Sequence, residues 1–79
     1  MSYDFSVDQL RSLATMDVTS CPLEMGAEDD LLYALETAAC ESRLRVEDDG
    51  RADLVLLAAR LKRQARRMSW VIRIREGVR

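Results

Sequence analysis

The sequence contains no histidine, and it has only one proline and three glycines. Without histidine it lacks the commonest general base and metal ligand, and a Ser-His or Cys-His nucleophile pair is excluded. The glycines are isolated from one another, so no glycine-rich phosphate-binding loop is encoded. Cys21 and Cys40 are not in a C-x-x-C motif, which argues against a zinc site within one chain. We therefore expect a protein that is not an enzyme and that uses no metal or cofactor.

Long apolar runs are also missing. No stretch approaches the roughly 18 apolar residues of a membrane-spanning helix, and the first residues lack the basic and apolar regions of a secretory signal. Two cysteines without such a signal fit a reducing compartment better than a disulfide framework. Arginine outnumbers lysine eleven to one, a bias typical of GC-rich genomes. These features predict a cytoplasmic, bacterial protein without a transmembrane segment.

The chain is short, and its supply of aromatic residues is small. Its 79 residues form one domain at most, and a chain of this size buries only about 60% of the surface that its unfolded form exposes. Four residues are aromatic, so the core must come from aliphatic side chains. Small scaffolds of this kind often gain stability by oligomerising or by packing regular helices. We therefore expect a partner, either a second copy in a homo-oligomer or another protein in a hetero-oligomer.

Charge is divided unevenly along the chain. Residues 1–50 hold twelve carboxylates against three arginines, a net charge of −9. Residues 51–79 hold nine basic residues against two carboxylates, a net charge of +7. Such an asymmetry between halves indicates an interaction surface.

A first helix is predicted from about residue 7 to residue 16. Ser6 and Gln9 have the spacing of a capping box, in which each side chain bonds the other residue's backbone N–H. Phe5 and Leu10 stand at the positions of a hydrophobic staple around this cap. Because so short a helix is marginal alone, we expect it to dock on another element.

A second helix is predicted over about residues 27–46. Its first turn carries three consecutive carboxylates, Glu28, Asp29 and Asp30, where the helix dipole favours negative charge. An apolar stripe follows at alternating spacings of three and four residues. Gly50 is placed to adopt the left-handed conformation that ends a helix.

The third segment carries the strongest pattern. Apolar side chains repeat there at alternating spacings of four and three residues, which predicts a helix over about residues 52–75. Two helices of similar length joined by a short Asp-Asp-Gly turn indicate an antiparallel hairpin. We predict a single all-α domain over residues 1–79, with a short N-terminal amphipathic helix followed by an antiparallel two-helix hairpin. Its coiled-coil-like seam consists of Leu54, Leu57, Leu61, Met68 and Ile72.

One alternative fold stays open from the sequence. Residues 44–47 and 70–75 alternate in residue type and are rich in β-branched side chains, as strands are. Asp49-Gly50 is also a good hairpin turn. An α+β arrangement with a C-terminal strand at about residues 70–75 is therefore the alternative, and the continuous seam favours the helix.

The third predicted helix has more apolar surface than one neighbour can cover. It is apolar nearly all round between residues 54 and 61, and such helices are buried on several sides. An apolar face left exposed would mark an interaction site. The leading hypothesis is a non-enzymatic adaptor or chaperone-like subunit that binds a partner helix by coiled-coil-type packing. The alternative is that these apolar residues are ordinary core within the chain. The candidate partner-binding residues are Val55, Leu56, Trp70 and Ile74.

Basic residues cluster on the same helix and support other readings. They could neutralise phosphates in a small nucleic-acid-binding regulator, with Trp70 stacking on a base. A basic amphipathic helix could instead lie on an anionic membrane surface. The candidate nucleic-acid contacts are Arg60, Lys62, Arg63, Arg66 and Arg67.

The charges also suggest a purely structural role. Carboxylates of the second helix could face the basic residues of the third and set the direction of the hairpin. The acidic members of this expected pairing are Glu28, Glu36, Glu41 and Glu47, and the basic members are Arg60, Lys62, Arg63 and Arg67.

Overall fold

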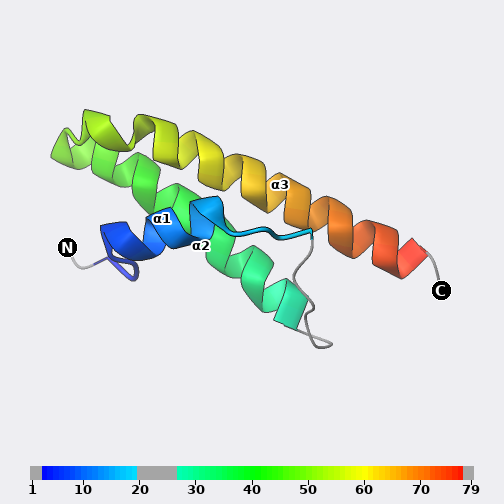
Figure 1. Ribbon diagram of the computed structural model, residues 1–79. Coiled ribbons are helices and arrows are strands. Elements are labelled where there is room, and N and C mark those ends of the chain that lie inside the picture. Colours follow the sequence, from blue (N-terminus) through cyan, green and yellow to red (C-terminus); the bar gives the residue numbers. More distant parts are fainter. Residues whose placement is uncertain (1–2, 20–26, 78–79) are drawn as a thin grey trace.

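The computed structural model describes residues 3–19 and 27–77, and this part of the chain is helical without any strand (Figure 1). Its elements are α1 (Val7–Thr15), α2 (Ala27–Asp49), a short 3₁₀ turn η1 (Ala52–Leu54) and α3 (Val55–Gly77). Helices α2 and α3 lie side by side and run antiparallel, and α1 packs on both (Figure 1). The predicted all-α fold with a helical hairpin is confirmed.

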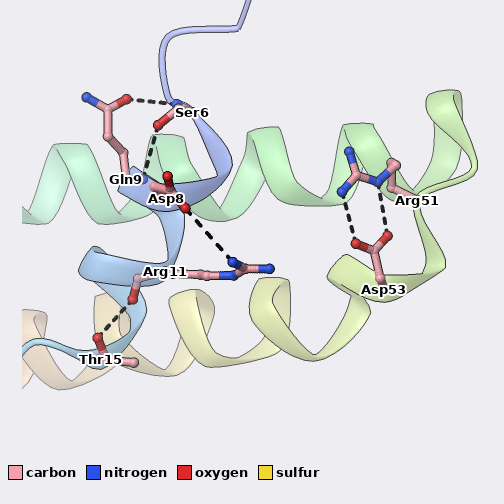
Figure 2. Close-up of polar contacts among 7 residues, drawn as sticks. All are labelled: Ser6, Asp8, Gln9, Arg11, Thr15, Arg51 and Asp53. Carbon is pink, nitrogen blue, oxygen red and sulfur yellow. Dashed lines mark hydrogen bonds and ion pairs between the residues drawn. The ribbon is translucent and has the colours of Figure 1, made fainter.

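Helix α1 begins at the predicted capping box (Figure 2). The Gln9 backbone N–H donates to Ser6 Oγ at 3.2 Å, and the Ser6 backbone N–H donates to Gln9 Oε1 at 2.7 Å. Two of the N–H groups that a helix start leaves without partners are thereby satisfied. An Asp8–Arg11 ion pair at 3.9 Å lies on the exposed side of the helix and stabilises it by at most about 1 kcal/mol.

The hairpin turn follows the chemistry expected of Gly50. This glycine has φ of +69°, the left-handed conformation that side chains with a Cβ adopt at a cost. After it, the Arg51 guanidinium bonds Asp53 through two nitrogens, Nε to Oδ1 at 3.0 Å and an Nη to Oδ2 at 2.9 Å (Figure 2). Helix α2 continues three residues beyond its predicted end, to Asp49.

The alternative with a C-terminal strand is wrong. Residues 70–75 lie within α3, and residues 44–47 lie within α2. Met68 is fully buried and Ile72 packs against the core, so the helical spacing of the seam places both on the inner face. Packing of this face outweighs the local preference of β-branched residues for strands.

The core lies where α1 crosses the hairpin. The buried side chains come from all three helices and from the segment after α1, and they are Leu10, Ala14, Val18, Leu35, Ala38, Leu61, Ala65 and Met68. Among the seam residues, Leu61 and Met68 belong to this cluster, while Leu57 and Ile72 are partly buried against it. Leu54 is buried near the turn. Among the described residues, no helix is long and apolar enough to cross a bilayer.

Candidate functional site

Three polar side chains of α2, Glu41, Arg45 and Asp49, hold the segment that leads into α1. Glu41, which is 7% exposed, accepts a hydrogen bond from the Phe5 backbone N–H at 3.2 Å. One turn later, Arg45 donates to the Phe5 carbonyl and lies over the Tyr3 ring, with its guanidinium carbon 4.3 Å from the ring centroid. The Tyr3 hydroxyl donates to Asp49 Oδ2 at 2.9 Å. The spacing of four residues between the three α2 side chains places them on one face of the helix. This face is occupied by Tyr3 and Phe5 of the same chain.

A second polar contact holds the other end of α1. Gln64 of α3 is 7% exposed, and its Nε2 donates to the carbonyl oxygens of Leu13 at 3.2 Å and Met16 at 2.5 Å. These carbonyls belong to the C-terminal end of α1, where carbonyl groups lack helical partners. Helix α1 is thus fixed at both ends, and it covers one side of the hairpin.

A groove runs between α2 and α3, and no residue of α1 lines it. Its volume is about 570 Å³, within the range of small-molecule sites in proteins. The small side chains of Ala39, Ala58 and Ala65 contribute to its lining. Because these side chains are short, an occupant could approach the backbones of both helices closely.

The groove is strongly basic. Four of its lining residues are cationic, Arg43 from α2 and Lys62, Arg66 and Arg73 from α3, whereas Glu36 is its single carboxylate. Within residues 3–19 and 27–77, none of these five side chains takes part in an ion pair. The groove therefore presents a net charge of +3 that no described residue neutralises.

Trp70 adds a large aromatic side chain to the groove. It lines the cavity while 63% of its surface is exposed to solvent. Ile74, one turn further along α3, is 52% exposed. Residues four apart are neighbours on a helix surface, so these two form an apolar edge beside the basic groove.

Comparison with protein-family models, with curated proteins and with solved structures found no match to this chain.

The four predicted partner-binding residues are all exposed, but they do not form one patch. Val55 is 54% and Leu56 63% exposed, at the turn end of α3. Trp70 and Ile74 lie near its other end. Trp70 follows Leu56 by fourteen positions along the helix, which corresponds to about 21 Å. Leu56 lines a smaller depression shared with α1, whereas Trp70 lines the groove.

The expected pairing of acidic α2 with basic α3 is wrong: none of the predicted pairs forms among the described residues. Within residues 3–19 and 27–77, the one ion pair between the two helices joins Glu28 to Arg75, which was not a predicted partner. Glu41 bonds the Phe5 backbone instead, and Glu36 and Glu47 are exposed to solvent. The reason is that the contact between the helices is built from the apolar seam, which leaves most charged side chains on other faces.

The predicted nucleic-acid contacts are all exposed and divide into two groups. Lys62 and Arg66 line the groove, while Arg60, Arg63 and Arg67 line a shallow depression beside Gln64 and Ala14. None of the five forms an ion pair in the described part of the chain.

The perturbed pKa values belong to groups outside the groove. The hydrogen bond to Asp49 raises the pKa of Tyr3, because deprotonation would remove the donated proton and place a second negative charge beside the carboxylate. The bidentate contact lowers the pKa of Asp53 and raises that of Arg51. Among the described residues, no group of three Cys, Asp or Glu side chains is placed to hold a metal ion.

Sequence reasoning missed the groove and the two contacts that hold α1. The basic residues were visible as a cluster. Arg43 precedes this cluster by seventeen residues and Arg73 follows it by six, so neither was counted with it. Gln64 was not among the predicted site residues. Its position beside apolar residues in a helical stripe was the signal that it would be buried and would need partners.

Proposed function

We propose that this chain is a non-enzymatic interaction module, an adaptor or chaperone-like subunit, that binds a partner protein on the side of the hairpin that α1 does not cover. The observation that carries this proposal is Trp70, an indole that is 63% exposed at an open groove. An aromatic ring buries roughly 150–250 Å² when it is covered. Tryptophan and arginine are the residues that most often dominate binding energy at protein interfaces, and both are present here.

Ile74 extends the proposed contact along α3. It adds apolar area one turn from Trp70, and together they supply the apolar centre that a polar or charged rim surrounds in protein interfaces. Val55 and Leu56 lie too far away for the same small contact. They stay a separate prediction, and a partner would reach them only by extending along most of α3.

Site-specific photocrosslinking in the native cells tests this function. A photoreactive phenylalanine analogue placed at Ile74 should crosslink a defined protein, and the same analogue at Tyr33 should not. Tyr33 is 72% exposed on α2 and does not line the groove, so it is a matched control for exposure. The crosslink should disappear in a Trp70→Ala background. The proposal fails if both positions capture the same proteins, or if Trp70→Ala leaves the crosslink intact.

One observation favours a second candidate, a nucleic-acid-binding regulator. The five exposed basic residues of α3 have no ion pair among the described residues, so their side chains are not held by carboxylates of α2. Titration with duplex DNA at two salt concentrations separates the candidates. Binding that weakens steeply with salt, and that Arg63→Ala with Arg67→Ala reduces, would favour the regulator. No binding at low salt leaves the protein-interaction module.

A further inference from the structure

We propose that the groove between α2 and α3 binds an amphipathic helix of another protein, one whose apolar stripe is flanked by carboxylates. This inference rests on the proposed function and specifies the chemistry of its partner. Three features of the groove support it: its position between two antiparallel helices, the absence of ion pairs from its cations among the described residues, and the indole at its edge.

The shape of the groove suits a helix. Its two walls are antiparallel helices of 23 residues each, about 34 Å long. The residues that line it come from about two turns of α2 and four turns of α3. Packed helices lie 8–10 Å apart depending on the side chains between them, and the alanines in the lining permit the shorter distance. A third helix laid there would bury its apolar stripe against Ala39, Ala58, Ala65 and Trp70.

The charge of the groove defines what must flank that stripe. Cations stand on both walls, Arg43 on α2 and Lys62, Arg66 and Arg73 on α3. In packed helices, charged residues beside the apolar seam select the partner and its orientation. Lys62, Arg66 and Arg73 follow one another at intervals of four and seven residues. Carboxylates repeated at intervals of three or four residues on the bound helix would meet them.

The same charge argues against a second copy of this chain. A two-fold symmetric interface brings the same patch of both subunits together. Two grooves placed face to face would oppose +3 with +3, a net charge that already includes Glu36 of each copy. Like charges placed together across an interface are strongly unfavourable.

A nucleic acid fits the groove less well than a helix does. Proteins that bind single strands offer several aromatic side chains on which successive bases stack. This groove holds one ring, Trp70, and the methyl groups of three alanines. The four cations of the groove suit phosphates as well as carboxylates. The methyl groups between them cannot pair with a base edge, whereas they pack well against leucine and isoleucine side chains.

Trp70 is the only tryptophan of the chain, so its fluorescence reports directly on the groove. The full chain is titrated with a synthetic amphipathic helix that carries glutamates beside a leucine stripe. The matched control peptide has the same stripe with glutamines in place of the glutamates. We expect the glutamate peptide to shift Trp70 emission to shorter wavelength and to bind roughly tenfold more tightly than the control.

Charge reversal provides the specific control. Arg66→Glu combined with Arg73→Glu changes two exposed side chains, and unchanged helical circular dichroism checks that the variant folds. This variant should lose the preference for the glutamate peptide and should prefer a peptide with lysines at the same positions. Arg60→Glu combined with Arg67→Glu, outside the groove, should leave the preference as it is.

Four outcomes would overturn the inference. They are equal binding of both peptides, no shift in emission, a concentration-dependent dimer that shields Trp70, and a single-stranded oligonucleotide that displaces the glutamate peptide. If one of these occurs while photocrosslinking at Ile74 still captures a defined protein that Trp70→Ala loses, the proposed function stands and only the partner chemistry is wrong. If the crosslink also fails, both proposals fall.

Discussion

Gln64 offers a sharp test of how the hairpin holds α1. Its Nε2 donates to two carbonyl oxygens at the end of α1, at 3.2 and 2.5 Å, and its side chain is 7% exposed. A hydrogen bond of this kind contributes about 0.5–1.5 kcal/mol net. Gln64→Leu, which keeps a similar volume and removes both donors, should therefore lower the free energy of unfolding by about 1–3 kcal/mol. A chain of this length has a total stability of roughly 4–12 kcal/mol, so the loss is readily measured.

Gln64→Glu gives the same test a dependence on pH. At neutral pH the introduced carboxylate would lie beside two carbonyl oxygens with no proton to donate, so this variant should be less stable than Gln64→Leu. Burial and the neighbouring oxygens raise the pKa of such a carboxyl above its unfolded value of about 4.3. Protonation then favours the folded state, so the variant should gain stability relative to the wild type as the pH falls through that raised pKa.

Urea denaturation followed by circular dichroism measures both variants, and amide hydrogen exchange shows whether α1 loosens first. Arg67→Leu is the control, because Arg67 is exposed on α3 and forms no ion pair among the described residues. Two results would refute the role given to the Gln64 hydrogen bonds. One is a change in the free energy of unfolding below about 0.3 kcal/mol for Gln64→Leu, and the other is a stability of Gln64→Glu, relative to the wild type, that does not depend on pH.

Three further predictions follow from single residues. Leu61→Ala removes a fully buried core side chain and should cost about 2–5 kcal/mol in urea denaturation. Gly50→Ala should lower the free energy of unfolding by about 1 kcal/mol because of its positive φ alone, since a Cβ there meets no atom within 4 Å. Gly77→Ala is the control: a Cβ is equally unobstructed there within α3, and the change should be neutral or slightly stabilising. Asp49→Asn should lower the pKa of Tyr3, measured by NMR of its ring carbons, because the neighbouring carboxylate is what raises it; an unchanged midpoint would contradict the hydrogen bond. Because the pKa of Tyr3 is raised by folding, the hydrogen bond to Asp49 stabilises the folded state below the unfolded pKa of about 10. This stabilisation is lost as the pH rises through the raised pKa of the folded state.

The helices could be predicted because their signals are local. Ser6 and Gln9 fix the start of α1 through contacts three residues apart, and Gly50 ends α2 through its own φ. The seam could be predicted because its period of three and four residues extends from Leu54 to Ile72, longer than any competing strand pattern. Such features need no knowledge of what lies distant in sequence, which is why they were visible before the fold was known.

The contacts that depend on tertiary position could not be predicted in the same way. Glu41 could equally have faced α3 or the segment before α1, and only the docking of α1 decides between them. The groove likewise brings Arg43 beside Lys62 and Arg66, residues whose nearness depends on the register of the two helices. The apolar pattern of α3 predicted that Trp70 is exposed, but it could not show that the basic groove lies next to this side chain.

The acidic first part of the chain and the basic second part do not hold the hairpin together by ion pairing. Burial of Leu61, Met68 and Leu35 supplies the contact between the helices, and one ion pair, Arg75 with Glu28, joins them among the described residues. This pair is partly exposed, Arg75 at 42% and Glu28 at 20%. Exposed pairs contribute about 0–1 kcal/mol, whereas burial of one leucine contributes about 1.5–3 kcal/mol. The cations of the groove form no ion pair among the described residues, and their like charges repel one another. A carboxylate-bearing partner in the groove would relieve that repulsion, and this relief is available only in the complex.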